Sequence, residues 1–173
     1  MSVLTAESRR DVEIQRFPAL VYVLAPVIAL VLQAWLPRVL GRFAWFDLPL
    51  VVTVFFAMSR RHPIQGSVMG GILGIFEDAL TGHPIGINGV AKTLAGYLAA
   101  SMGVLINVEN YTIRLLLTFV LSLLGSVTYF FVYRVLLGLQ MESSWMPELY
   151  KAIGNSLIAV VVFPLLDRTK IRD

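Results

Sequence analysis

Residues 64–89 read Ile-Gln-Gly-Ser-Val-Met-Gly-Gly-Ile-Leu-Gly-Ile-Phe-Glu-Asp-Ala-Leu-Thr-Gly-His-Pro-Ile-Gly-Ile-Asn-Gly. Small or acidic residues recur at every fourth position in this stretch, namely Gly66, Gly70, Gly74, Asp78 and Gly82. On a helix, successive members of such a series lie about 40° apart and form a slowly winding stripe without bulk. The stripe predicts the close approach of another helix backbone. The adjacent carboxylates of Glu77 and Asp78 predict a site or a structural hydrogen-bonding centre, because charges are costly in an apolar setting.

The composition indicates a membrane protein. Of the 173 residues, 57% are hydrophobic and 14% are charged, and the mean hydropathy is +0.77, whereas soluble domains have an apolar share near half or below. The absence of cysteine excludes disulfides and thiolate chemistry. The basic residues behind the net charge of +3 occur at the ends of hydrophobic segments and form no contiguous patch, so no nucleic-acid partner is expected.

Six hydrophobic segments predict an all-α integral membrane protein, a compact bundle of about six transmembrane helices. They comprise residues 17–35, 45–58, 64–80, 86–106, 114–139 and 149–166. The second and third, at about 14 and 17 residues, are short for a hydrocarbon core of about 30 Å, so a thinned bilayer, shielding by neighbouring helices and a partly re-entrant course all stay open. The first segment is longer than the apolar part of a usual signal peptide and is expected to stay in the membrane.

The domain organisation follows from these segments. Residues 1–16 are expected to form a cytoplasmic tail, residues 17–166 the six-helix transmembrane domain, and residues 167–173 a second cytoplasmic tail. Ser8 and Asp11 have the spacing of a weak capping box, so the first tail is either a short interfacial helix or a solvated segment.

The distribution of basic residues predicts that both termini are cytoplasmic. One side of the six segments carries only Arg38 and Arg42 in its loops. The opposite side carries Arg9, Arg10, Arg16, Arg60, Arg61, Arg114, Arg168, Lys170 and Arg172. The tryptophans at positions 35, 45 and 145 fall near the non-cytoplasmic ends of the segments, where indole rings settle among lipid headgroups, and they indicate the same orientation.

The two carboxylates of the opening stretch are expected to have different roles, because adjacent positions on a helix point about 100° apart. Asp78 continues the glycine stripe and is expected to accept hydrogen bonds from the following turn or from the start of the next helix. Asn88 and Lys92 share a face of the fourth segment at a similar depth. Lys92 either forms an intramembrane ion pair, for which Glu77 is the better candidate, or extends to the outer interface.

Small and polar residues on the last three segments predict helix contacts, because small side chains let helices approach closely in lipid. One series on the fourth segment comprises Ala91, Ala95, Ala99 and Gly103, and one on the fifth comprises Thr118, Ser122 and Ser126. Tyr133, Arg134, Lys151 and Asn155 resemble ordinary interfacial anchors.

The sequence gives little support for catalysis. His62 and His83 fall on opposite sides of the membrane in this topology, which argues against a shared metal site. Two neighbouring carboxylates on one helix do not form a face-to-face acid pair, and no Gly-x-Ser-x-Gly motif or phosphate-binding loop is present. We therefore expect no enzyme, no metal and no cofactor.

Three runs of sequence together have a familiar pattern. They are residues 70–89, Gly-Gly-Ile-Leu-Gly-Ile-Phe-Glu-Asp-Ala-Leu-Thr-Gly-His-Pro-Ile-Gly-Ile-Asn-Gly, residues 92–98, Lys-Thr-Leu-Ala-Gly-Tyr-Leu, and residues 46–50, Phe-Asp-Leu-Pro-Leu. On these runs the chain resembles the bacterial rod shape-determining protein MreD family. The resemblance covers nearly the whole chain from about residue 17 to residue 166. Asp78, Gly82, Pro84 and Gly86 occupy the most recognisable stretch.

The resemblance implies a non-enzymatic, multi-pass subunit of the bacterial inner membrane that belongs to the cell elongation machinery. Its implied partners are MreC and, indirectly, the MreB filament, a RodA-type glycosyltransferase, a class B penicillin-binding transpeptidase and membrane lipid. The family's six-helix architecture also resembles the substrate-binding subunits of energy-coupling-factor vitamin transporters. This second resemblance makes a small-molecule transporter the alternative. An ion path through Glu77, Asp78 and Lys92 is a third hypothesis. It is disfavoured because the inner half of the bundle contains no chain of ionisable residues that would continue the path.

Overall fold

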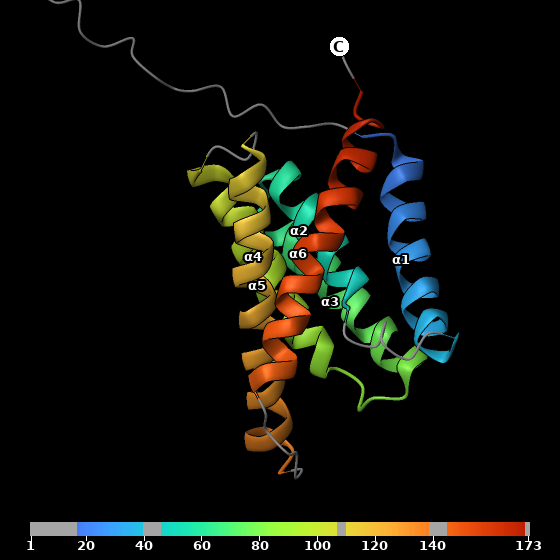
Figure 1. Cartoon of the computed structure of the whole chain (residues 1–173), viewed down its shortest axis with the longest axis vertical. Helices are drawn as coiled ribbons and strands as arrows, with labels where there is room; N and C mark the ends of the chain where they lie inside the picture. Colours follow the sequence, from blue (N-terminus) through green and yellow to red (C-terminus); the bar gives the residue numbers. More distant parts are fainter. Residues whose placement is uncertain (1–16, 40–45, 107–109, 139–144, 172–173) are drawn as a thin grey trace, which may run out of the picture.

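The computed structural model of the chain describes residues 17–39, 46–106, 110–138 and 145–171, and these ranges contain six α-helices and no strand (Figure 1). The fifth α-helix continues into a short π-helix, η2. The bounds are α1 Ala19–Val39, α2 Leu48–Arg60, α3 Pro63–Thr81, α4 Ile87–Leu105, α5 Tyr111–Phe131, η2 Val132–Leu136 and α6 Trp145–Asp167.

The helices follow the six predicted hydrophobic segments in number and order, with shifted ends. The largest difference at a helix start is in α6, which begins at Trp145 rather than at the predicted residue 149. Glu148 in its first turn interrupts the apolar run, so hydropathy places the helix start too late, whereas a carboxylate there suits the positive end of the helix dipole. The N-terminal tail expected at residues 1–16 lies outside the described residues.

Three helical segments in the described ranges are long and apolar enough to cross a membrane, namely Ala19–Val39, Tyr111–Val135 and Trp145–Asp167. Such helices fit a transmembrane protein. The helix α2 is apolar but has only 13 residues, while α3 and α4 are interrupted by glycine and polar side chains. The count of six membrane crossings therefore stays a prediction.

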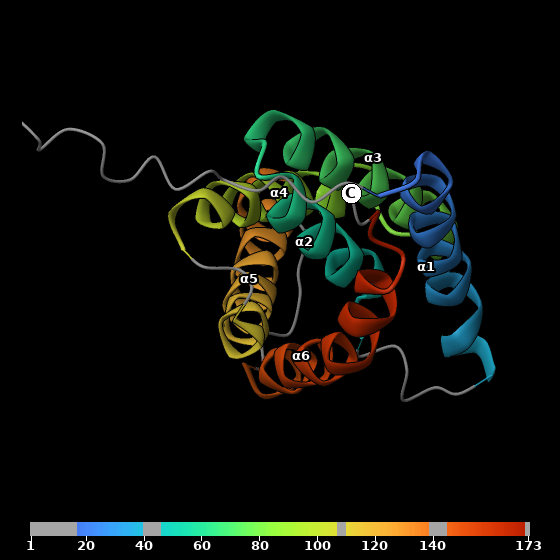
Figure 2. The same cartoon turned by 90° about the horizontal axis from the view of Figure 1, so that it is seen from above.

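The short helix α2 lies at the centre of the bundle (Figure 2) and contacts α1, α3, α4, α5 and α6. Every residue from Pro49 to Ser59 is buried. Its phenylalanines, Phe55 and Phe56, pack edge-on against each other, and Phe163 of α6 lies beside Phe55. The neighbouring helices thus surround α2. Of the three explanations for its short length, this arrangement agrees with shielding from lipid by neighbouring helices.

Helix α3 packs more extensively against α4 than against any other helix, and the glycine stripe lies in this contact. A Cβ atom added to Gly70 would collide with the backbone carbonyl of Lys92, and one added to Gly74 would collide with that of Asn88. The predicted close approach is therefore confirmed for this part of the stripe. Gly66 continues the contact, since a Cβ there would lie 2.5 Å from the carbonyl oxygen of Gly96.

The prediction that Gly82 continues this contact is wrong. A Cβ on Gly82 would have no neighbour within 4 Å, and the residue caps the end of α3 with a left-handed backbone, φ 76°. Its backbone N–H donates to the carbonyl of Asp78. Glycine is favoured here because it adopts this conformation without steric cost, so the regular spacing at this position reflects the helix end and not the helix contact.

The start of α1 and the end of α6 lie at the same end of the bundle (Figure 1). An ion pair at this end joins α5 to α6, with Arg114 Nη1 2.7 Å from Asp167 Oδ2. The Arg114 guanidinium also lies over the rings of Phe55 and Phe163. This arrangement agrees with the expectation that the two ends of the chain share one side of the membrane, and the cytoplasmic assignment of that side stays a prediction.

Replacing Arg114 with methionine should destabilise the protein by about 2 kcal/mol, because it removes charge-assisted hydrogen bonds and the cation contacts with both rings. Asp167→Asn should cost less, because the Asp167 side chain is one-third exposed and water can replace its partner. The free energy of unfolding in mixed detergent micelles measures both effects. Equal losses in the two variants would contradict a role of Arg114 in packing.

Candidate functional site

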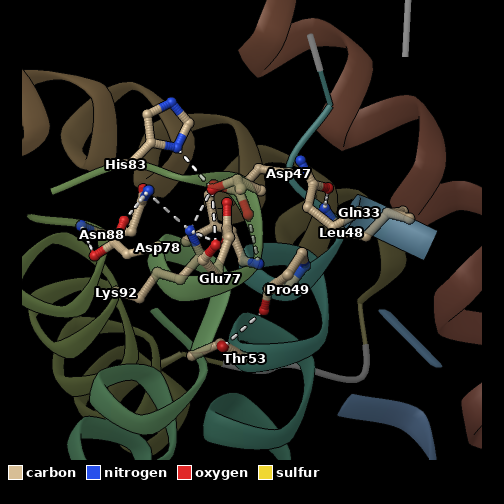
Figure 3. Close-up of polar contacts among 12 residues, drawn as sticks. Gln33, Asp47, Leu48, Pro49, Thr53, Glu77, Asp78, His83, Asn88 and Lys92 are labelled. Carbon is tan, nitrogen blue, oxygen red and sulfur yellow. Dashed lines mark hydrogen bonds and ion pairs between the residues drawn. The ribbon is translucent and has the colours of Figure 1, made fainter. Parts of the chain in front are cut away.

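Three buried charges meet between α2, α3 and α4 (Figure 3). The ammonium group of Lys92 lies 2.7 Å from Glu77 Oε2 and 2.9 Å from Asp47 Oδ2. The exposed fractions are 1% for Lys92, 6% for Glu77 and 4% for Asp47. We call these three residues the charge triad. Lys92 thus pairs with Glu77, which is the pairing favoured from the sequence, and it does not extend to the outer interface.

Each helix contributes one member of the charge triad near an end. Asp47 caps the start of α2, where its Oδ1 accepts a hydrogen bond from the backbone N–H of Leu50 at 2.9 Å. Glu77 lies in the last turns of α3, and Lys92 lies in the second turn of α4. Because Gly70 and Gly74 let α3 and α4 approach closely, the ammonium of Lys92 reaches both carboxylates from the α4 side.

Asp78 forms a second polar centre beside the charge triad. Its Oδ2 accepts hydrogen bonds from the backbone N–H of Gly86 at 2.8 Å and of Asn88 at 3.1 Å. Its Oδ1 accepts one from Asn88 Nδ2 at 2.7 Å. These donors lie at the start of α4, where backbone N–H groups lack partners within the helix. The predicted role of Asp78 as a hydrogen-bonding centre for the turn is confirmed.

The connection between α3 and α4 contains the other residues singled out in the sequence. Gly86 has a left-handed backbone, φ 105°, directly before α4 begins, and Pro84 is exposed in the turn. Asn88 links the two polar centres, because its Oδ1 also lies 3.4 Å from Lys92 Nζ. Asp78 therefore fixes the turn, and Asn88 connects the turn to the charge triad.

Two further residues complete the site and were missed in the sequence. Asn155 of α6 is fully buried; its Oδ1 accepts from the backbone N–H of Asp47 at 2.8 Å, and its Nδ2 donates to Ser122 Oγ at 2.7 Å. The interpretation of Asn155 as an interfacial anchor is therefore wrong. Gln33 of α1 accepts from the N–H of Leu48 at 3.1 Å and donates to the carbonyl of Phe46 at 2.9 Å.

Asp47 lies in the family-like run at residues 46–50 and has no predicted role of its own. A signal was available, because an aspartate followed by Leu-Pro is a typical helix start, with the carboxylate as cap and proline in the first turn. That signal predicts the cap but not the ion pair with a residue 45 positions away. Nothing in the residues around Asp47 indicates this long-range contact.

A cavity of about 280 Å³ lies beside the charge triad, where residues near the end of α3 and the start of α6 line it. Its wall includes Gln33, Glu77, Ser126, Tyr129, Glu148 and Lys151. Residues of α1, α3, α4, α5 and α6 therefore line a partly open cavity that contains several polar side chains, at the end where the topology predicts the outer leaflet.

The chemistry of the site is that of a structural joint with an adjoining polar cavity. Lys92 is held by two carboxylates, and Asp78 is occupied by three hydrogen-bond donors, so neither side chain is placed as a nucleophile or a proton donor. The fold and site define a helical membrane protein in which buried charges join the central helices.

Comparison with known families identifies the chain further. The family model of the rod shape-determining protein MreD matches residues 14–168, and the chain belongs to this family. Searches of curated proteins and of solved structures found no match.

Proposed function

We propose that this protein is a non-enzymatic subunit of the bacterial cell elongation complex in the inner membrane. In this role it joins MreB filaments, through MreC, to lateral peptidoglycan synthesis by a RodA-type glycosyltransferase and a class B penicillin-binding transpeptidase. All six helices cross the membrane, and residues 1–16 and 167–173 lie in the cytoplasm. The family match over residues 14–168 carries the proposal, because the family is one of rod shape determination.

The internal contacts support a scaffold. A scaffold requires a fixed arrangement of its helices, and a buried ion pair fixes one arrangement because separation leaves charges unpaired in a medium of low polarity. The charge triad joins α2, α3 and α4 in this way, and Asn155 attaches α6 to the same point. Large parts of the outer helix surfaces stay apolar and free to contact lipid or other helices.

The outward face of α3 and α4 is the surface that we assign to partner helices in this proposal. A shallow groove of about 640 Å³ runs between the two helices, with Ser67, Gly71, Gly89 and Thr93 in its wall. Small residues let a further transmembrane helix approach closely. Ile75 and Val90 form part of the wall and are half exposed, so side chains introduced at these positions point to whatever covers the face.

Site-specific crosslinking in living cells tests this role. A photoreactive amino acid at Ile75 or at Val90 should capture MreC or a helix of the synthase, whereas the same group at Val161 of α6, which is 69% exposed, should capture mainly lipid. Depletion of the protein should at the same time convert rods into rounded cells. Rod shape that persists after depletion, or the absence of MreC and synthase adducts from every exposed position, would contradict the proposal.

The polar cavity favours one second candidate, the substrate-binding subunit of an energy-coupling-factor type transporter. Binding sites are typically concave and contain a few convergent polar groups, and the cavity has this character. The transporter predicts substrate uptake that depends on an ATP-driven module, and uptake that is lost together with the protein while rod shape persists would favour it over the scaffold.

A further inference from the structure

The cavity beside the charge triad has more carboxylates than cations among its described residues. Asp47 and Glu77 share the single ammonium group of Lys92. Glu148 lies in the wall, where it makes no ion pair or hydrogen bond with the described part of the chain, and Lys151 Nζ lies 4.0 Å from Asp47 Oδ2. Three carboxylates thus face two ammonium groups, and Asp78 adds a further negative charge nearby, because its hydrogen-bond donors are neutral amides. A cation in the cavity would offset part of this excess negative charge.

The wall also contains an unsatisfied acceptor. Ser126 of α5 is 7% exposed, and its Oγ has no hydrogen-bond partner in the described structure. Buried hydroxyl groups ordinarily have a partner, and each exception calls for an explanation such as a bound group. Ser126 lies in the wall of the same cavity as Glu77 and Glu148, so an N–H donor placed there would meet both a hydroxyl and carboxylate oxygens.

Aromatic rings form much of the remaining wall. Tyr129 and His83 contact each other edge-on, with centroids 6.2 Å apart, and Phe46 lies in the same wall. Aromatic faces attract organic cations through the ring quadrupole. A volume of about 280 Å³ also exceeds the space of a bare ion, and the described residues contain no group of three acidic or histidine side chains placed to hold a metal ion.

We propose that this cavity is a binding site for one organic cation, an alkylammonium or guanidinium group, between Glu77, Ser126, Tyr129 and Glu148. The group belongs either to a small free amine or to a basic side chain of a partner protein that enters the cavity. The proposal concerns a ligand that neither the family nor the scaffold role specifies, and it stands apart from both.

The cysteine-free chain allows a direct test of the charge in the cavity. Thr81 lies in the wall, is half-buried, and donates from its hydroxyl to the carbonyl of Glu77 four residues earlier. Ser101 of α4 is a matched control, since it is also half-buried and donates to the carbonyl of Tyr97 four residues earlier. Single-cysteine variants Thr81→Cys and Ser101→Cys of the purified full chain are labelled with a trimethylammonium-ethyl and with a sulfonatoethyl methanethiosulfonate.

For each variant we compare the labelling rate of the cationic reagent with that of the anionic reagent. This rate ratio should be roughly tenfold higher for Thr81→Cys than for Ser101→Cys, because negative potential in a cleft concentrates cations. Ethylammonium or guanidinium at millimolar concentration should slow the labelling of Thr81→Cys severalfold, while sodium at equal ionic strength should not. Adding Glu148→Gln should remove most of this protection. Because Glu148 is only half-buried and makes no hydrogen bond or ion pair within the described part of the chain, that variant should fold normally.

Equal ratios at the two cysteines, or labelling that neither ethylammonium nor guanidinium slows, would overturn the proposal. Protection that survives in Glu148→Gln would overturn it as well. Labelling of Thr81→Cys in intact cells separates the two sources of the cation. If Thr81→Cys loses its protection from labelling when the partner protein that supplies the side chain is depleted from the cells, the cation is a basic side chain. If the protection is lost instead when the purified protein is washed, the cation is a free amine.

Discussion

Replacing Lys92 with methionine should destabilise the protein by about 3–5 kcal/mol, the range for removal of one partner from a buried ion pair. Methionine has a similar length and apolar bulk, so the substitution removes the charge with little change in packing. The carboxylates of Glu77 and Asp47 would then stay buried without a cation. We expect a large drop in folded protein, measured by size-exclusion chromatography after detergent extraction and by unfolding in mixed micelles.

Two companion variants show that charge is the cause. Lys151→Met removes an ammonium group that is 28% exposed and 4.0 Å from Asp47, and it should cost less than about 1 kcal/mol, as weakly coupled exposed pairs do. Glu77→Gln in the Lys92→Met background should recover part of the lost stability, because one unpaired carboxylate is removed. If Lys92→Met folds as well as the parent, the charge triad does not hold the helices together.

Gly70→Ala should separate α3 from α4 and destabilise the protein by about 3 kcal/mol, the upper part of the usual range for overpacking. The added Cβ would collide with the carbonyl group of Lys92, and a backbone group cannot rotate away as a side chain can. A shift of α4 would also move the ammonium of Lys92 away from its carboxylates. We therefore expect loss of close packing and loss of ion pairing together.

Gly125→Ala provides the matched control, because a Cβ at Gly125 in the middle of α5 would meet no atom within 4 Å. Alanine has the higher helix propensity, so this variant should have a stability between that of the parent and about 1 kcal/mol above it. Unfolding in mixed micelles compares the two variants. Similar stabilities for Gly70→Ala and Gly125→Ala would exclude a special role of the α3–α4 contact.

The sequence predicted the helices well, because hydropathy and turn residues act locally. The stripe of Gly66, Gly70 and Gly74 indicated a close helix contact, since every fourth residue lies near the same face whatever the partner. The pairing of Lys92 with Glu77 was also accessible, because α3 and α4 are neighbours in sequence with a short connection. Local spacing and adjacency therefore carried these predictions.

The missed parts depend on contacts between distant segments. Asn155 and Asp47 are 108 positions apart, and nothing in the spacing around either residue indicates that α6 passes beside the start of α2. Asn155 was interpreted from its position near a helix end, where interfacial residues are common, although it is fully buried. The prediction that Gly82 continues the helix contact failed for another reason. A helix cap and a helix contact both favour glycine, and the spacing does not distinguish them.

The order of the charge triad along the chain bears on how the protein is made. Asp47 and Glu77 leave the ribosome before Lys92, so for a time two carboxylates belong to α2 and α3 while their cation has not yet been synthesised. A lone carboxylate enters a bilayer only at considerable cost, and α2, with 13 residues, is too short to enter firmly alone. We therefore expect segment 47–105, with its three helices, to insert into the bilayer as one unit after Lys92 has been synthesised.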